Sequence, residues 1–362
     1  MKTYFLFILI ISIRAGSAQG QTSDFSQDEK GLKDYYSTYF PLGVAVSPQA
    51  LKGEEAQLIR RHFVSMTPEN VMKMGPIHPE EDQYNWGPAD QIVAFARANN
   101  LKLRGHALCW HNQVPNWLFV NSDGSEVSKQ ELLDRLKKHI TAVVTRYQED
   151  IYAWDVVNEA ISDKKDEFYR DSPWYRICGE EFIAKAFEYA RNADPDAQLF
   201  YNDYEVINPV KREKIYELVK RLKENNVPID GVGIQGHWSI YEPSEEVLRS
   251  TIERFSGFGL KVQITELDVS VYKKEHTRRE ATSDDTDEFT VEQKQKQVEQ
   301  YEMIFSVFRA FQEELTAVTF WNISDRYSWL DYFPVRGRKD YPLLFDQELK
   351  PKAAYWKVVD FD

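Results

Sequence analysis

The sequence has little cysteine, and its 45 Lys and Arg residues are outnumbered by 58 Asp and Glu residues. Its 362 residues include 2 cysteines, Cys109 and Cys178, which cannot build a disulfide framework, although a single bond between them stays open. We expect a buried free thiol at Cys109, because this residue lies within an apolar stretch. The net charge of −13 disfavours nucleic acid and anionic membranes as partners, since both attract basic protein surfaces.

The apolar stretch near the N-terminus is too short to cross a membrane. It covers residues 4–13, whereas a spanning helix needs about 20 residues. Lys2 precedes it and small residues suited to cleavage follow it, which is typical of a secretory signal peptide. We therefore expect residues 1–20 to be removed and residues 21–33 to form a flexible segment. The mature protein is expected to be secreted or periplasmic, with no membrane partner.

A glycine-rich phosphate turn is missing after the first expected strand. That strand, residues 43–46, leads into Ser47-Pro48-Gln49, which has none of the glycines of a dinucleotide-binding fold. A doubly wound open sheet is therefore disfavoured. The chain also shows no linker, low-complexity tract or second domain.

Strand-like and helix-like segments alternate along the rest of the chain. The expected strands are residues 43–46, 63–67, 101–110, 151–157, 198–202, 231–234, 261–267 and 315–321. Amphipathic helices separate them, and two of these helices open with capping boxes at residues 128–131 and 290–293. Because parallel strands need helical crossovers, we predict the α/β class and a single (β/α)₈ TIM barrel over residues 34–362. A charged insertion at residues 273–289 is expected to be a flexible solvated loop, with a lid over the cleft as the alternative.

Unusual polar and aromatic residues cluster at the predicted carboxyl ends of these strands, where TIM barrels place their active sites. The set comprises Glu69, Asn70, Lys73, His106, Trp110, His111, Gln113, Asn158, Glu159, Tyr201, Asn202, Tyr204, Gln235, His237, Glu266, Asp268, Trp321 and Trp329. Acids and amides bind sugar hydroxyls, and flat aromatic rings stack on pyranose faces. Aromatic residues make up 14% of the chain, which suits such a cleft but also fits a large aromatic core.

Two glutamates end two of the most apolar strands. Glu159 follows residues 151–157, and Glu266 lies near the end of residues 261–267. Paired carboxyl groups are the minimum equipment for cleaving a glycosidic bond. Either glutamate alone could be an ordinary loop acid, but the pair at two buried strand ends indicates a glycosidase.

At this point the sequence resembles glycoside hydrolase family 10, the retaining endo-1,4-β-xylanases, over about residues 34–360. The resemblance rests on Glu69-Asn70-x-x-Lys73, Gly105-His106-x-x-x-Trp110-His111-x-Gln113, Trp154-Asp155-Val156-Val157-Asn158-Glu159, Tyr201-Asn202-Asp203-Tyr204, Gln235-Gly236-His237 and Ile264-Thr265-Glu266-Leu267-Asp268. One position departs from the family: Asn322 follows Trp321 where the family usually has glycine. Asn322 also begins a glycosylation sequon, which we interpret as a coincidence.

The resemblance implies a role for each matching residue. Glu266 would be the nucleophile, Glu159 the general acid and then the base, and the two carboxyl groups would lie roughly 5 Å apart. His237, oriented by Asp268, would keep Glu266 ionised, and Asn158 would bind the sugar 2-hydroxyl. The implied substrate-binding residues are Glu69, Asn70, Lys73, His106, Trp110, Gln113, Tyr204, Gln235, Trp321 and Trp329. Asp155 and Thr265 are expected to have supporting rather than catalytic roles.

The leading hypothesis is a secreted endo-1,4-β-xylanase that acts as a monomer on xylan and xylo-oligosaccharides. The alternatives are a β-1,4-glucanase or aryl-cellobiosidase on the same fold, and a non-hydrolytic xylan-binding protein. No cofactor is needed in any of these cases. We expect no metal site, because His106 and His111, five residues apart on one strand, would point to opposite faces.

Overall fold

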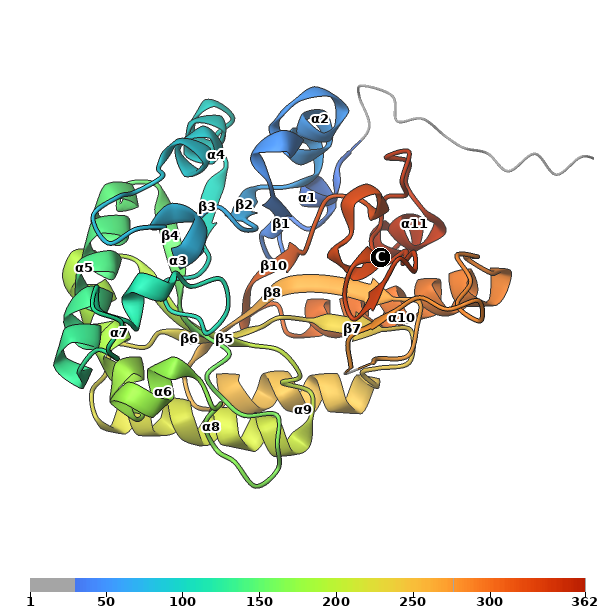
Figure 1. Ribbon diagram of the computed structural model, residues 1–362. Helices are drawn as coiled ribbons and strands as arrows, with labels where there is room; N and C mark the ends of the chain where they lie inside the picture. The colour runs from blue at the N-terminus through green and yellow to red at the C-terminus, as the bar shows by residue number, and fades with distance from the viewer. Residues whose placement is uncertain (1–29, 276, 362) are drawn as a thin grey trace, which may run out of the picture.

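Eight parallel strands close into a barrel in the computed structural model, which describes residues 30–275 and 277–361 (Figure 1). The barrel strands are β1 (Leu42–Val46), β2 (Ser65–Pro68), β3 (Lys102–Gly105), β4 (Ile151–Asn158), β5 (Gln198–Asp203), β6 (Gly231–Ile234), β8 (Lys261–Ser270) and β10 (Leu315–Phe320). Neighbouring strands pair in this order, and β10 pairs with both β8 and β1 to close the ring. The predicted (β/α)₈ barrel is confirmed.

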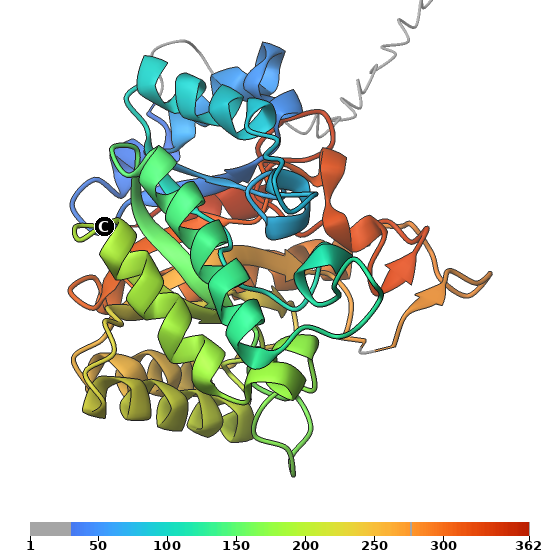
Figure 2. The same ribbon diagram turned by 60° about the vertical axis from the view of Figure 1, so that its left-hand side comes forward.

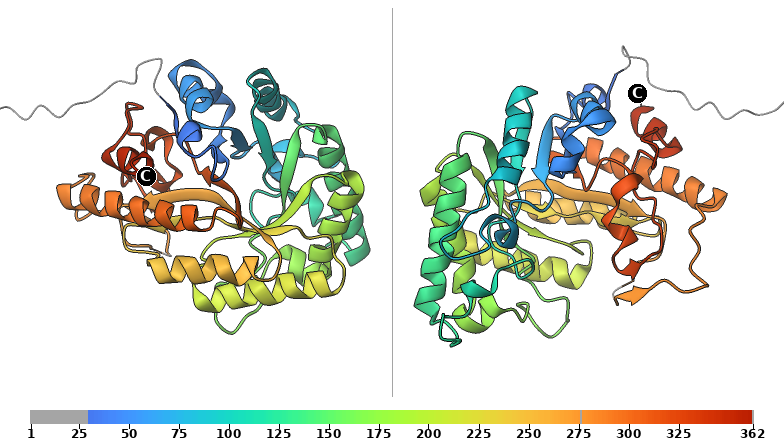
Figure 3. Two further views of the ribbon diagram at one scale, coloured as in Figure 1. Left: turned by 180° about the vertical axis from the view of Figure 1, so that it is seen from behind. Right: turned by 45° about the horizontal axis from the view of Figure 1, so that its top comes forward.

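A helix follows each barrel strand, and all but the last of these helices lead the chain back to the next barrel strand, as Figures 2 and 3 show from three further directions. These helices are α2 (Gly53–His62), α4 (Gly87–Ala98), α5 (Lys129–Tyr147), α7 (Glu181–Ala193), α8 (Pro209–Glu224), α9 (Glu245–Ser256), α10 (Val291–Ala310) and α11 (Ala353–Val359). Both predicted capping boxes form, at the first residues of α5 and α10. Short helices α1 (Leu32–Tyr35), α3 (Met74–Ile77) and α6 (Pro173–Cys178) complete the α-helical elements of the described chain.

The inside of the barrel is partly polar, whereas the layer between strands and helices is apolar. Arg104 on β3 is 1% exposed and donates two hydrogen bonds to Asp155 on β4 and one to Gln263 on β8. Such a buried pair is tolerated because every charge meets an opposite charge or a hydrogen-bonding partner. Trp154 on β4 and Phe187 on α7 are fully buried, as expected for apolar strand and helix faces packed together.

The strand predicted at residues 101–110 is wrong in its second half, because β3 ends at Gly105. A cis peptide bond joins His106 and Ala107, and hydrogen bonds to β4 resume only at the Leu108 and Cys109 amides. An apolar run does not distinguish a strand from a buried irregular segment. His106 and His111 therefore do not share a strand, and the prediction that they point to opposite faces of one strand is wrong.

Both cysteines are buried free thiols in the structure. The expected free thiol at Cys109 is thus confirmed. Cys109 lies just beyond β3 rather than within a strand, and it forms an isolated β-bridge with Val157. The alternative of a bond to Cys178 does not occur.

Two further pairings were not predicted. Strand β7 (His237–Ser239) pairs with the far end of β8, beyond the barrel wall. The insertion at residues 273–289 contributes β9 (Arg279–Glu280), which pairs with β11 (Val335–Arg336) in a small sheet at the edge of the molecule (Figure 2). Arg279 forms ion pairs with Glu275 and Asp285, so ion pairs connect separate positions within the described part of this insertion.

The folded part of the chain begins before residue 34, the predicted start of the domain. Leu32 opens α1 and is fully buried, so the last residues of the segment expected to be flexible belong to the fold. The signal peptide predicted at residues 1–20 lies outside the described residues. Within residues 30–275 and 277–361, no helix combines the length and apolarity that a membrane span requires.

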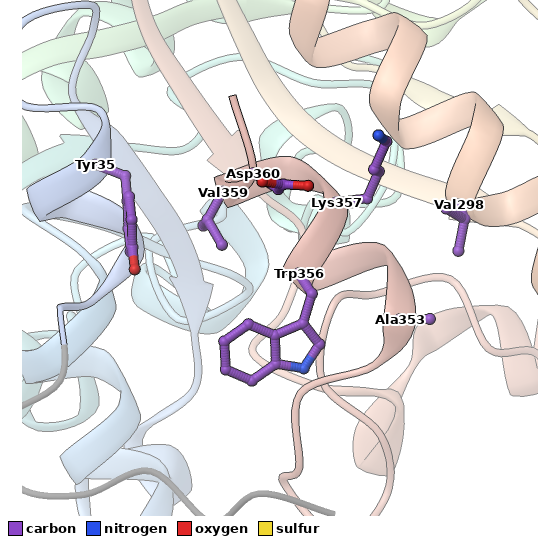
Figure 4. Close-up of a pocket in the computed structure, with 7 residues that line it drawn as sticks. All are labelled: Tyr35, Val298, Ala353, Trp356, Lys357, Val359 and Asp360. Carbon is purple, nitrogen blue, oxygen red and sulfur yellow. The ribbon is translucent and has the colours of Figure 1, made fainter. Parts of the chain in front are cut away.

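A surface hollow lies between α1, α10 and α11, close to the end of the described chain (Figure 4). Its lining residues are Tyr35, Val298, Ala353, Trp356, Lys357, Val359 and Asp360. None of the residues predicted for the functional site lies in this hollow, so it does not compete with the barrel mouth as the candidate site.

We predict that Gly105→Ala destabilises the barrel. A Cβ atom at this position would lie 2.1 Å from the Trp154 ring, which is fully buried and cannot retreat. Overpacking of this kind costs about 3 kcal/mol of unfolding free energy, which urea denaturation would measure. Gly87→Ala is the matched control: its Cβ would meet no atom within 4 Å, and its effect should stay within about 1 kcal/mol. Equal stability of the two variants would contradict this packing account.

Candidate active site

The two glutamates at the barrel mouth are joined by a chain of side-chain amides. The Asn202 Nδ2 donates to Glu266 Oε1 at 2.7 Å and to Asn158 Oδ1 at 2.9 Å. The Gln235 Nε2 donates to Glu159 Oε1 at 2.9 Å and to Asn158 Oδ1 at 3.4 Å. The structure therefore brings Glu159 and Glu266 together in one site, as predicted from their places at strand ends.

Strand register explains this convergence. Asn158 and Asn202 are direct partners across β4 and β5, so their side chains meet at the same height of the barrel. The amide of Glu159, the residue after Asn158, donates to the Asn202 carbonyl. On β8, the Glu266 amide donates to the Gln235 carbonyl. Parallel strands thus deliver their last side chains to a common edge.

Glu266 is a buried carboxylate whose environment favours the ionised form. It is 4% exposed; its Oε2 lies 3.1 Å from His237 Nε2 and its Oε1 lies 4.0 Å from His106 Nδ1. Burial alone would raise the pKa of Glu266, but the hydrogen bond from His237 and the charges of His106 and His237 lower this pKa below the usual glutamate value. A group that stays ionised at this position can act as a nucleophile.

His237 is oriented by Asp268, its direct partner in the β7–β8 pairing. Its Nδ1 lies 2.8 Å from Asp268 Oδ2, an oxygen that also accepts a hydrogen bond from Trp329 Nε1 at 2.8 Å. Burial opposes protonation, but Asp268 and Glu266 together raise the pKa of His237 from 6.5 to about 9. The protonated imidazole stabilises the folded state fully below pH 6.5, and this contribution is lost as the pH rises through about 9.

Glu159 presents its carboxyl group to the same space from β4. Its Oε2 accepts from Trp110 Nε1 at 2.8 Å and its Oε1 accepts from Gln235. The residue adopts φ of 58°, a left-handed conformation that is rare for glutamate and that directs the side chain off the end of the strand. A carboxyl group fixed by two neutral donors is suited to proton transfer.

A second buried network supports Glu266 from below. Asp155 accepts hydrogen bonds from Arg104 and lies 2.9 Å from His106 Nδ1. Burial would raise the pKa of Asp155, but the charge of Arg104 and the hydrogen bonds from His106 and Arg104 lower it overall. Asp155 therefore has the supporting place that was predicted for it, and so has Thr265, whose hydroxyl donates to Asn202 Oδ1 at 2.6 Å.

The residues predicted to bind sugar on the non-reducing side form one cluster. The Lys73 ammonium donates to Asn70 Oδ1 at 2.9 Å and lies 4.8 Å from the Trp110 ring and 5.9 Å from the Trp321 ring. Gln113 reaches the same Asn70 oxygen at 3.4 Å. Burial lowers the pKa of Lys73, whereas the charges of Glu266, Glu69 and Glu159 act to raise it. Lys73 therefore belongs to the site rather than to a helix surface.

Glu69 and the two tryptophans border the same cluster. Burial raises the pKa of the Glu69 carboxyl, against the lowering influence of Lys73. The Trp321 ring lies 5.2 Å from His106, and the Trp329 ring lies 4.8 Å from His237. Both indoles therefore stand beside the imidazoles that flank Glu266.

Tyr204 is linked to Glu159 through Arg170. Its hydroxyl donates to Asp163 and accepts from Arg170 at 2.8 Å. The same Arg170 donates through Nε to the Glu159 carbonyl at 2.8 Å. Arg170 thus connects the Tyr204 hydroxyl to the main chain of the predicted acid/base residue.

Sequence reasoning assigned no role to Asn202 or Arg104. Asn202 is fully buried and is the amide that binds Glu266 and Asn158 together. Its position at a strand end was a usable signal, whereas its link to two other strands depends on register and was not visible in the sequence. Arg104 lies inside the barrel and gave no signal, because a charged residue within a strand usually faces solvent.

Asn322, the departure from the expected glycine, adopts φ of 129°, a region that favours glycine. Its own side chain compensates: Nδ2 donates to the Tyr327 carbonyl at 3.0 Å, and Oδ1 accepts from the Ile323 amide at 2.9 Å. The loop between Trp321 and Trp329 is therefore tied by the residue that departs from the pattern.

Comparison with known proteins agrees with this site. The profile described as glycosyl hydrolase family 10 matches residues 31–361. The chain belongs to glycosyl hydrolase family 10. Within the described residues, no group of three or more His, Cys, Asp or Glu side chains is arranged to hold a metal ion.

Several relatives of this family member are similar over most of their length. A beta-1,4-xylanase of Dictyoglomus thermophilum is 48% identical over 332 residues, which cover 91% of this chain and 90% of that protein. Endo-1,4-beta-xylanase B of Paenibacillus barcinonensis is 46% identical over 93% of this chain and 100% of its own. The crystal structure of xylanase XynB from Paenibacillus barcinonensis, complexed with a conduramine derivative, superimposes with a TM-score of 0.88 at 45% identity, covering 93% of this chain and 100% of that chain. A mutant structure in complex with xylotriose also gives 0.88, at 45% identity, covering 92% and 100% of the two chains.

We predict that His237→Gln raises the pKa of Glu266. The substitution removes a cation that lies 3.1 Å from the carboxylate, and the loss of this charge leaves burial as the dominant influence. Carbon-13 NMR titration of labelled glutamate carboxyls would follow the change. Lys357→Gln, which removes a surface cation paired with Glu302, is the control and should leave the pKa of Glu266 unchanged. An unchanged or lower pKa in His237→Gln would contradict the electrostatic account.

Proposed function

We propose that this family 10 protein is a secreted endo-1,4-β-xylanase that cleaves internal bonds of xylan with retention of configuration. The observation that carries the proposal is the pairing of an ionised, His237-bound Glu266 with a neutrally hydrogen-bonded Glu159 across one amide chain. A retaining glycosidase needs one carboxylate as nucleophile and a second carboxyl group that gives and then takes a proton. The names of the relatives support xylan as the substrate.

In the first step, a carboxylate oxygen of Glu266 attacks the anomeric carbon and forms a covalent glycosyl-enzyme. The bond from that carbon to the glycosidic oxygen breaks, and the departing oxygen receives the proton of Glu159. His237 and Asn202 bind Glu266 throughout, so the nucleophile arrives oriented. Asn158, which lies next to Asn202, is placed to bind the 2-hydroxyl of the same sugar.

In the second step, water attacks the anomeric carbon from the side that the leaving group vacated. Glu159, now a carboxylate, takes a proton from this water, and the bond to Glu266 breaks to regenerate the free nucleophile. Two inversions at one carbon restore the β configuration. Trp110 and Gln235 can donate to Glu159 in both protonation states, since each bond uses a lone pair of the carboxyl group.

Xylose is preferred to glucose because indoles stand close to the nucleophile. Trp321 and Trp329 lie beside His106 and His237, and they leave little room for the hydroxymethyl group that only glucose carries. Lys73, Asn70 and Gln113 would bind hydroxyls of the sugar residues on the non-reducing side, where Glu69 supplies a further acceptor. Tyr204 would line the leaving-group side.

We also propose that residues 1–20 direct export and are removed, and that the remaining chain forms one catalytic domain. Export suits an enzyme whose polymeric substrate cannot enter the cell. A monomer is sufficient for activity, because both carboxyl groups and the partners described above come from one chain.

Substitution of either glutamate tests the proposal. Glu266→Ala and Glu159→Ala should each lower xylan hydrolysis by at least about 10³-fold, measured as new reducing ends, because each removes an obligatory step. Glu299→Ala, at an exposed position on α10, is the matched control and should retain wild-type activity. Near-normal activity in either site variant would contradict the assignment.

The wild-type protein separates the remaining alternatives in the same assay. Xylan binding without new reducing ends would favour a glycan-binding protein. Equal efficiency on xylo- and cello-oligosaccharides of the same length would favour a broader β-1,4-glucanase.

A further inference from the structure

We propose that Tyr201 and Asp203, a hydrogen-bonded pair behind the cleft, position Glu159 for proton transfer. The inference rests on the proposed function, because it assigns the pair to the acid/base step of that reaction. Both residues are fully buried, so neither can touch a substrate. Their influence must therefore pass through the groups that they bind.

The Tyr201 hydroxyl binds the main chain immediately after Glu159. It accepts hydrogen bonds from the Ala160 amide at 3.0 Å and the Ile161 amide at 3.1 Å, and it donates to Asp203 Oδ2 at 2.5 Å. A hydroxyl group has two acceptor positions and one proton, so all of its capacity is used. Among residues 30–275 and 277–361, no other side chain hydrogen-bonds to these two amides.

Asp203 fixes the direction of that hydroxyl. Its Oδ1 accepts from Lys211 Nζ at 2.8 Å and from the Tyr204 amide at 2.9 Å, which leaves Oδ2 for Tyr201. Lys211 also reaches Asp163 Oδ1 at 2.7 Å, so the same cation ties β5 to the segment that follows Glu159. The pair is therefore part of a wider network that extends from buried Asp203 through Lys211 to Asp163 at the surface, rather than a single contact.

This network matters because Glu159 has an unusual backbone. A left-handed φ of 58° does not persist in a glutamate unless the surrounding structure imposes it. The residue's own amide and carbonyl are bound by Asn202 and Arg170, and the next two amides are bound by Tyr201. Without the hydroxyl, the segment after Glu159 loses two of its anchors and the carboxyl group loses its fixed approach to the glycosidic oxygen.

Leaving-group dependence tests this role, because only a poor leaving group needs a proton from Glu159. In Tyr201→Phe, kcat/KM for phenyl β-xylobioside should fall about 50-fold, whereas kcat/KM for 2,4-dinitrophenyl β-xylobioside should change by less than about 3-fold. Tyr36→Phe is the matched control. Tyr36 is a fully buried tyrosine whose hydroxyl donates to the Val358 carbonyl and accepts from Arg309, and both rates should stay at the wild-type level in this variant.

Asp203→Asn provides the second variant, because it retains the Tyr201 hydroxyl while a neutral amide replaces the carboxylate that accepts from Tyr201, Lys211 and the Tyr204 amide. It should show the same selective loss, and it carries the test if Tyr201→Phe does not fold as judged by circular dichroism and thermal unfolding. A uniform loss on both substrates, or no loss on either, would overturn the inference. If the wild-type protein hydrolysed neither aryl xylobioside, the proposed function itself would fail, and the two failures are thereby distinguished.

Discussion

A negative charge buried within β8 is the constraint on which the site depends. Glu266 is almost fully shielded from water, and an unpaired carboxylate in such a place would cost several kcal/mol or more. His237 compensates this charge directly, and Asp268 in turn keeps His237 protonated. The site is therefore an alternating row of charges, acid, base and acid, in which removal of His237 would take away the cation that lies between two buried carboxylates.

The barrel supplies the rigidity that such a row requires. His237 and Asp268 are partners in the β7–β8 pairing, and Asn158 and Asn202 are partners in the β4–β5 pairing. Main-chain hydrogen bonds thus fix the relative height of these side chains. The ion pair of Arg104 with Asp155 fills the barrel interior beneath the site and extends the charge compensation to His106.

Much of this arrangement could be predicted from the sequence, because strand ends are marked by a change from apolar to polar residues. This change identifies Glu159 and Glu266. The number and order of the barrel strands follow from the alternation of strand-like and helix-like segments. The ends of the strands are harder to predict from the sequence, because the apolar run through Cys109 continues after β3 has ended at Gly105. Buried apolar segments look alike in sequence whether or not they are paired.

Contacts between distant strands were beyond sequence reasoning. Asn202 joins Glu266 to Asn158, which depends on the register of β4, β5 and β8. The Tyr201–Asp203 pair on β5 binds the main chain after Glu159, which depends on the register of β5 with β4. The short strands β7, β9 and β11 have only two or three residues, too few to leave a periodic signal.

The most direct test of the central claim is proton NMR of the anomeric centres formed in the first minutes of xylan hydrolysis. Double displacement at Glu266 with Glu159 as acid and base predicts that β-anomeric xylo-oligosaccharides form first and mutarotate afterwards. First-formed α-anomers would mean a single displacement by water, and they would contradict the assignment of Glu266 as nucleophile.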